Sequence, residues 1–226
     1  MDFQDSEKEI AIKNILLYIG TMFGGQFILS LLFLNLYGDS LKTQANLFLF
    51  SYLITFLALF IYNYNFLKEE FKKFIKKFKT NFLYIIIAFF SLLFILYILG
   101  LIFDFFGYES NPENQKEIEN MYKYYKIHVI IASVFLAPLV EEIVYRKSVF
   151  GLINHKIKIF LSGFIFGLIH IISDPNLYTN FSYEIWNLIP YIVPGIVLAY
   201  TYYKSDNLLN TILIHMIYNV LAIISI

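Results

Sequence analysis

Long apolar blocks are the feature that most limits how this chain can fold. There are seven of them, each close to the roughly 20 residues that a helix needs to cross the hydrocarbon core of a bilayer. None alternates apolar and polar residues as a membrane barrel strand does, so each block is expected to be a helix. We therefore predict an all-α, multi-pass transmembrane helix bundle with spans at 10–37, 44–67, 82–107, 127–150, 157–173, 184–203 and 207–226.

The composition supports a membrane protein and argues against other classes. Apolar residues make up 59% of the 226 residues and charged residues 15%, whereas soluble domains have roughly 45–50% and about 25%. The formal net charge is zero and the lysines lie between apolar blocks, so no nucleic-acid partner is expected. The chain has no cysteine, which excludes disulfides, thiolate metal ligands and a cysteine nucleophile.

The placement of lysine and arginine predicts the orientation in the membrane. With a cytoplasmic N-terminus, thirteen of the seventeen basic residues fall in cytoplasmic segments, and the four outside are Lys42, Lys116, Lys123 and Lys126. Because basic loops stay on the cytoplasmic side, we expect the N-terminus inside and the C-terminus outside. The small size and a composition rich in Ile, Lys, Asn, Phe and Tyr suggest a bacterium with an AT-rich genome. The membrane is therefore expected to be a bacterial cell membrane.

Two connections between spans have their own patterns. Segment 68–79 has lysines on one helical face and Phe71, Phe74, Ile75 and Phe78 on the other. This pattern predicts a basic amphipathic linker along the inner headgroups that attracts anionic lipid, with a solvated basic loop as the alternative. The outer stretch 108–126 is polar and acidic, and we interpret it as a loop or as part of a lid.

The first half of the chain looks simpler than the second. No internal repeat or low-complexity segment is present, so we expect one membrane domain. The first three spans of the chain carry hydroxyl and amide side chains but almost no ionisable groups. Residues 1–124 are therefore interpreted as scaffold helices. The ionisable residues of the apolar blocks lie in residues 125–226.

Two adjacent carboxylates and an arginine lie in the fourth span. Intramembrane charges cost roughly 2.5–3.5 kcal/mol each, so each needs a physical reason. Glu142 and Arg146 are four residues apart on one helical face and are predicted to form an ion pair. Glu141 points about 100° away and has no partner in its own helix, so it is free for chemistry. Pro138, one turn earlier, is expected to kink the backbone there.

The fifth and last spans carry the other candidate residues. Gly163, Gly167 and His170 fall on one stripe of the fifth span. Glycines four apart let a neighbouring helix approach closely, so His170 should face the interior of the bundle. In the last span, His215 and Asn219 share a face.

The depths of these groups predict that they meet. At about 1.5 Å per residue, Glu141 lies about 14 Å and His170 about 20 Å from the inner end of its span. The same rise puts His215 at about 12 Å and Asn219 at about 18 Å. Spans that run in different directions thus place their polar groups at middle depth, which indicates a shared site. A purely structural polar network is the alternative.

Three motifs in this order resemble the CPBP intramembrane proteases, the group of CAAX-processing type II prenyl endopeptidases and bacteriocin-immunity (Abi) proteins. The patterns are E-E-x-x-x-R, F-x-x-x-H and H-x-x-x-N, and no position is missing. In this chain they read Glu141-Glu142-Ile-Val-Tyr-Arg146, Phe166-Gly-Leu-Ile-His170 and His215-Met-Ile-Tyr-Asn219. The resemblance makes residues 125–226 the catalytic transmembrane core. The best-described eukaryotic relatives have eight spans, whereas seven are counted here. Either a variable peripheral helix is absent, or the boundaries around 174–203 hide a break at Pro190 and Pro194 that makes an eighth.

The resemblance implies hydrolysis of a peptide bond. Glu141 and His170 would hold and deprotonate an attacking water, since a carboxylate shielded from solvent can act as a general base. His215 and Asn219 would donate hydrogen bonds to the developing oxyanion. Glu142 and Arg146 would hold the helix in place. As the alternative, Glu141, His170 and His215 would be three ligands of an open zinc site with water as the fourth. No H-E-x-x-H helix is present, and the scheme without a cofactor is favoured.

The same resemblance suggests the partners. Type II CAAX relatives remove three residues after a prenylated cysteine, and bacterial relatives are linked to bacteriocin self-immunity and to maturation of peptide signals. We therefore expect a membrane-associated peptide or a prenylated protein as substrate. One alternative is a non-catalytic immunity or regulatory scaffold that acts by binding. A proton-coupled transporter is disfavoured because no inverted repeat is present.

Overall fold

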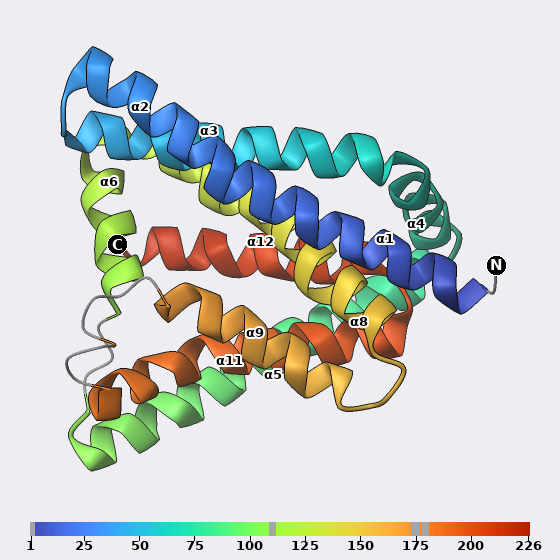
Figure 1. The fold of residues 1–226 in the computed structure, drawn as a ribbon. Helices are drawn as coiled ribbons and strands as arrows, with labels where there is room; N and C mark the ends of the chain where they lie inside the picture. The colour runs from blue at the N-terminus through green and yellow to red at the C-terminus, as the bar shows by residue number, and fades with distance from the viewer. Residues whose placement is uncertain (1–2, 109–111, 173–176, 178–180) are drawn as a thin grey trace.

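The computed structural model describes residues 3–108, 112–172, 177 and 181–226, and the regular structure of these residues is helical throughout. Figure 1 shows long helices packed side by side, with the N-terminus and α4 at one end and the C-terminus and α6 at the other. The prediction of an all-α, multi-pass helix bundle is confirmed. In chain order the elements are α1 (Phe3–Tyr18), η1 (Ile19–Gly25), α2 (Gln26–Tyr37), α3 (Leu41–Tyr62), α4 (Tyr64–Lys76), α5 (Phe78–Phe106), α6 (Glu113–Val129), η2 (Ile130–Leu136), α7 (Ala137–Glu141), η3 (Glu142–Ser148), α8 (Val149–Leu152), α9 (Lys158–Ile171), α11 (Phe181–Ser205) and α12 (Leu208–Ile224).

Five of the seven predicted spans correspond to helices that are long and apolar enough to cross a membrane. These are Asp5–Tyr37, Leu41–Tyr62, Phe78–Phe106, Glu113–Leu152 and Ile185–Ser205. The other two predicted spans, 157–173 and 207–226, are apolar but shorter. Helix α9 has 14 residues and α12 has 17, and residue 173 lies outside the described residues. At about 1.5 Å per residue, α9 is about 21 Å long, less than the roughly 30 Å of the hydrocarbon core.

Helix α11 continues through both of its prolines. It runs without interruption from Phe181 to Ser205 and includes Pro190 and Pro194. A break at these prolines, one of the two explanations for the span count, is therefore not observed, and residues 181–205 form one helix. Residues 174–176 and 178–180 of the same region lie outside the described residues. A proline removes one backbone hydrogen bond and strains the preceding turn, but packing against neighbouring helices can maintain the helix.

The contact between α9 and α11 is a close approach of two backbones. A Cβ atom on Gly163 would lie 2.5 Å from Ile196 Cγ1 and 2.7 Å from the Ile196 nitrogen. A Cβ atom on Gly195 would lie 2.8 Å from the Gly163 Cα. Only glycine fits at either position without displacing a helix, which confirms that the predicted glycine stripe of the fifth span faces a neighbouring helix.

The outer stretch 108–126 is largely helical, so its interpretation as a loop is wrong from residue 113 onward. Helix α6 begins at Glu113 and has one non-helical residue, Tyr125. Polar pairs at helical spacing support it, with Lys116 Nζ 3.2 Å from Glu113 Oε2. The apolar side, including the buried Met121, packs on the bundle. Residues 109–111 lie outside the described residues.

The predicted amphipathic linker forms helix α4, which lies at the end of the bundle (Figure 1). Its buried side holds Phe74 and Glu70. Glu70 Oε2 accepts a hydrogen bond from the backbone N–H of Leu208 at 2.7 Å, and the Glu70 backbone oxygen accepts one from Asn207 Nδ2 at 2.9 Å. A carboxylate at a helix N-terminus contributes about 0.3–1 kcal/mol, so α4 stabilises the start of α12.

The fourth span is the most buried of the long helices. In its apolar stretch of 18 residues, 67% of the residues are buried inside the bundle. This span is not a regular α-helix. The five-residue α7, which contains Pro138, lies between the π-helical segments η2 and η3. The irregularity therefore lies on both sides of Pro138. π-Helical turns widen the helix and occur often at functional sites.

Candidate active site

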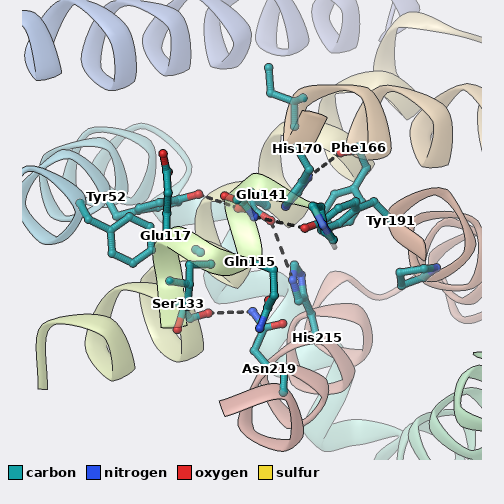
Figure 2. A pocket seen from close by; sticks show the side chains of 18 of the residues that line it. Tyr52, Gln115, Glu117, Ser133, Glu141, Phe166, His170, Tyr191, His215 and Asn219 are labelled. Carbon is teal, nitrogen blue, oxygen red and sulfur yellow. Dashed lines mark hydrogen bonds and ion pairs between the residues drawn. The ribbon is translucent and has the colours of Figure 1, made fainter. Parts of the chain in front are cut away.

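One cavity of about 660 Å³ is lined by all four side chains that were predicted to meet. Glu141 comes from the end of α7, His170 from α9, and His215 and Asn219 from α12. Figure 2 shows the side chains of Glu141, His170 and His215 turned toward the same space. Glu141 is 5% exposed and His215 is 4% exposed, so these ionisable groups are shielded from solvent. The predicted convergence is confirmed.

The Glu141 carboxylate is held by neighbours from other helices, as expected for a group without a partner in its own helix. Tyr52 on α3 donates a hydrogen bond from its hydroxyl to Glu141 Oε1 at 2.8 Å. The other oxygen, Oε2, lies 3.8 Å from His215 Nε2. One carboxylate oxygen is therefore fixed against α3, and the second faces the histidine of α12.

Glu142 connects Arg146 with the candidate site. Arg146 Nε lies 3.1 Å from Glu142 Oε2, which confirms the predicted ion pair, and both side chains are fully buried. The second oxygen, Oε1, lies 2.9 Å from His215 Nδ1. Because an ionised carboxylate only accepts hydrogen bonds, Nδ1 is the donor, and Nε2 is left to face Glu141. This second contact of Glu142 was not predicted.

The Arg146 guanidinium is paired more by charge than by hydrogen bonds. Its Nε and Nη1 atoms have no hydrogen-bond partner among the described residues. Its carbon Cζ lies 4.7 Å from the ring centroid of Phe166, at the distance of a cation–π contact. The motif residue Phe166 thus covers the buried cation.

His170 is positioned by its own helix and by α11. Its Nδ1 lies 2.7 Å from the carbonyl oxygen of Phe166. A carbonyl only accepts, so Nδ1 donates, and in the neutral ring Nε2 keeps its lone pair. The ring stacks on Tyr191 with centroids 4.6 Å apart and 21° between the planes.

Asn219 is anchored to the π-helical segment η2. Its Nδ2 donates a hydrogen bond to the backbone oxygen of Ser133 at 2.8 Å, visible as a dashed line in Figure 2. A primary amide has two N–H donors. The contact with Ser133 uses one and fixes the orientation of the other.

Sequence reasoning did not single out the tyrosines of the site. Five tyrosines among the described residues line the cavity: Tyr18, Tyr52, Tyr145, Tyr191 and Tyr218. The hydroxyls of Tyr18 and Tyr145 lie 3.0 Å apart. The chain has 19 tyrosines, and no spacing distinguishes these five from the rest. Helix α3, interpreted only as scaffold, supplies the hydrogen bond to Glu141.

Helix α6 forms part of the cavity wall. Asn114, Gln115 and Glu117, near its start, line the same cavity as Glu141. The polar stretch that was interpreted as a loop or as part of a lid thus lies against the candidate site.

The three ligands of the alternative zinc scheme, Glu141, His170 and His215, do not fit a metal as they are arranged here. Among the residues described, no three His, Asp or Glu side chains are placed so that they could hold a metal ion together. Glu141 Oε1 accepts the Tyr52 hydroxyl, and Glu141 Oε2 lies 3.8 Å from His215 Nε2. We therefore derive no step through a metal.

Comparison with known proteins supports the resemblance drawn from the motifs. Residues 124–221 match the family model "Type II CAAX prenyl endopeptidase Rce1-like", and this range contains every motif residue. No solved structure matches the chain.

Three curated bacterial relatives align with about a third to a half of this chain. The YdiL protein of Bacillus subtilis, named as a candidate membrane peptidase, is 26% identical over 123 residues, 53% of this chain and 45% of the relative. The UPF0177 protein YxdF of Lactococcus lactis is 31% identical over 81 residues, 35% of this chain and 40% of the relative. A protein of Mycoplasma capricolum without a functional name is 32% identical over 111 residues, 48% of this chain and 30% of the relative.

The chain thus spans less than half the length of each of these relatives. The family match and the peptidase name of one relative support a membrane protease in general. The C-terminal segment of this multi-pass membrane protein, residues 124–221, is similar to the Rce1-like type II CAAX prenyl endopeptidases, in agreement with its three motifs.

Proposed function

We propose that this protein is an intramembrane endopeptidase that hydrolyses a membrane-associated peptide or protein by direct attack of water. The observation that carries the proposal is the position of Glu141. Its carboxylate lies in a shielded cavity, fixed on one side by Tyr52 and turned on the other toward His215. A purely structural carboxylate would more simply be paired within its own helix, as Glu142 is with Arg146.

Glu141 and His170 are proposed to activate the water. Glu141 would take a proton from it, and the lone pair on His170 Nε2 would accept a hydrogen bond from its second hydrogen. The water oxygen then bonds to the scissile carbonyl carbon, and the carbonyl oxygen takes the negative charge. As the carbon–nitrogen bond breaks, Glu141 returns its proton to the leaving amine. General acid–base catalysis of this kind contributes about 10²–10⁴ in rate.

His215 and Asn219 are proposed to stabilise the oxyanion. The second N–H of the Asn219 amide is oriented by the contact with Ser133. His215 would donate from Nε2, which requires protons on both ring nitrogens. Glu142 Oε1, 2.9 Å from Nδ1, and Glu141 Oε2, 3.8 Å from Nε2, would hold the ring in the position from which it donates. Removing one oxyanion donor typically costs about 10²–10³ in rate.

The substrate class is proposed from the family match. A CAAX-type prenylated protein, a peptide signal that undergoes maturation, or a bacteriocin fits a site that lies among apolar helices. The N-terminus is proposed to be cytoplasmic, in a bacterial membrane, with the site reached from the cytoplasm or laterally from the bilayer. The competing proposal is a non-catalytic immunity or regulatory scaffold that acts by binding.

The variant Glu141→Gln separates the two proposals because it removes the base and keeps the size of the side chain. Purified protein in nanodiscs would be incubated with membranes from cells that lack it, and new peptide termini counted by mass spectrometry. We expect new termini with the wild type and at least about 100-fold fewer with the variant. Membrane insertion and thermal unfolding would be measured in parallel.

The matched control is Asp104→Asn, which removes an exposed carboxylate that does not line the large cavity. It should cleave like the wild type. If Glu141→Gln produced the same termini as the wild type, or if the wild type produced none, the peptidase proposal would be wrong.

A further inference from the structure

Helix α4 exposes a face that combines positive charge with apolar side chains. Lys68, Lys72 and Lys76 follow each other at four-residue spacing and are all exposed. Beside this stripe, Phe71 is 57% exposed and Ile75 is 53% exposed. In a helix such spacing places each set along one side, so the lysines and the two apolar side chains form adjacent stripes. We refer to these five residues as the α4 face.

The opposite side of α4 is bound to the start of α12. Glu70 is 2% exposed and accepts the backbone N–H of Leu208. Lys73 Nζ lies 3.0 Å from Glu70 Oε1 and 3.9 Å from Asp206, in the turn just before α12. The hydrogen bond to Glu70 raises the pKa of Lys73, so this lysine is charged at neutral pH.

We propose that the α4 face binds anionic phospholipid headgroups in the leaflet at the N-terminal end of the bundle, and that this binding holds the first turn of α12 in place. The charge of the three lysines complements the lipid phosphates, although Lys72 Nζ also lies 2.7 Å from the exposed carboxylate of Glu69. Phe71 and Ile75 can insert between the acyl chains, as apolar side chains of interfacial helices do. The position of α4 at one end of the bundle (Figure 1) suits a helix at the membrane surface.

The connection to α12 makes the lipid contact relevant to the candidate site. His215 follows Leu208 by seven residues, about 10 Å along the helix axis. A headgroup layer that fixes α4 therefore also fixes, through Glu70, the helix that carries His215 and Asn219. The proposal does not depend on peptidase activity, because it concerns only lipid binding and the stability of α12.

The lipid contact is tested with the whole protein in detergent, titrated with phosphatidylglycerol or phosphatidylcholine and observed by native mass spectrometry. The triple variant Lys68→Gln, Lys72→Gln, Lys76→Gln is compared with the control Lys42→Gln, Lys123→Gln, Lys126→Gln. The control removes three exposed lysines elsewhere. Each lysine near an anionic surface is worth about fivefold in affinity, so the α4 variant should bind phosphatidylglycerol on the order of a hundredfold more weakly.

The effect on α12 is tested by hydrogen exchange in nanodiscs with and without phosphatidylglycerol. In the wild type and the control variant, the anionic lipid should slow exchange in the first turn of α12, and in the α4 variant it should not. The proposal fails if the wild type shows no preference for phosphatidylglycerol, if the control variant loses as much affinity as the α4 variant, or if exchange in α12 does not respond to the lipid.

Discussion

Glu142 accepts a hydrogen bond from His215 Nδ1 at 2.9 Å while its other oxygen lies 3.1 Å from Arg146. One buried carboxylate therefore joins the fourth span to α12. The neighbouring Glu141 is left with one oxygen bound by Tyr52 and the other turned toward His215. Adjacent carboxylates thus have different surroundings because successive residues of a helix point about 100° apart.

The buried Glu142–Arg146 pair can be separated into its contributions to stability and to cleavage. Glu142→Gln leaves Arg146 as an uncompensated buried charge, which costs about 3–5 kcal/mol of stability. The double variant Glu142→Met, Arg146→Met removes both charges and should recover most of that stability, measured by unfolding in nanodiscs. It should not recover cleavage, because His215 has lost its Nδ1 partner. Recovery of cleavage together with stability would contradict the role of Glu142 in orienting His215.

Tyr52→Phe removes only the hydroxyl that holds Glu141 Oε1. A hydrogen bond to a charged group contributes about 1.5–3 kcal/mol, so we expect kcat to fall by about 10- to 100-fold with KM nearly unchanged. Tyr97→Phe, at an exposed position of α5, is the control and should behave like the wild type. Equal kinetics of both variants would exclude a positioning role for Tyr52.

Gly163→Ala tests the close approach of α9 and α11. The new Cβ atom would lie 2.5 Å from Ile196 Cγ1 and 2.7 Å from its backbone nitrogen, so one helix must move. Overpacking of this kind typically costs about 1–3 kcal/mol, and we expect a lower midpoint of thermal unfolding. At Gly100 on α5 nothing lies within 4 Å of the new atom, so Gly100→Ala should be tolerated. An unchanged midpoint in Gly163→Ala would show that the helices are not in tight contact.

Chelation distinguishes attack by free water from attack by water bound to zinc. We expect cleavage to persist after exhaustive treatment with 1,10-phenanthroline, with no stoichiometric metal in the purified protein by elemental analysis. Loss of cleavage that zinc restores would instead support ligation by Glu141, His170 and His215.

The orientation can be tested directly because the chain has no cysteine of its own. Lys123→Cys on α6 and Lys76→Cys on α4 introduce single thiols at exposed positions. With a cytoplasmic N-terminus, a membrane-impermeant maleimide should label position 123 in intact cells and position 76 only after permeabilisation. The reverse pattern would overturn the proposed orientation.

Features that depend on the residues of a single helix were predictable from the sequence. These are the position of the helix, pairs at four-residue spacing, and small residues that allow a close neighbour. The apolar blocks determine the helices, because a backbone inside lipid must satisfy its own hydrogen bonds. Four-residue spacing determined the Glu142–Arg146 pair, and small residues at Gly163 and Gly167 indicated a close neighbouring helix. Where polar residues occupied most positions, as in α6, the helical pattern was missed.

Only the tertiary structure decided which distant side chains meet. The bond from Tyr52 to Glu141 joins residues 89 positions apart, that between His215 and Glu142 joins residues 73 apart, and that from Leu208 to Glu70 joins residues 138 apart. Helical spacing determines the direction in which a side chain points, but it does not determine which helix lies opposite. The neighbours are chosen by the packing of the whole bundle. The sequence alone showed that Glu141, His170, His215 and Asn219 can take part in the site, whereas the fold added Tyr52 and decided how the side chains are paired.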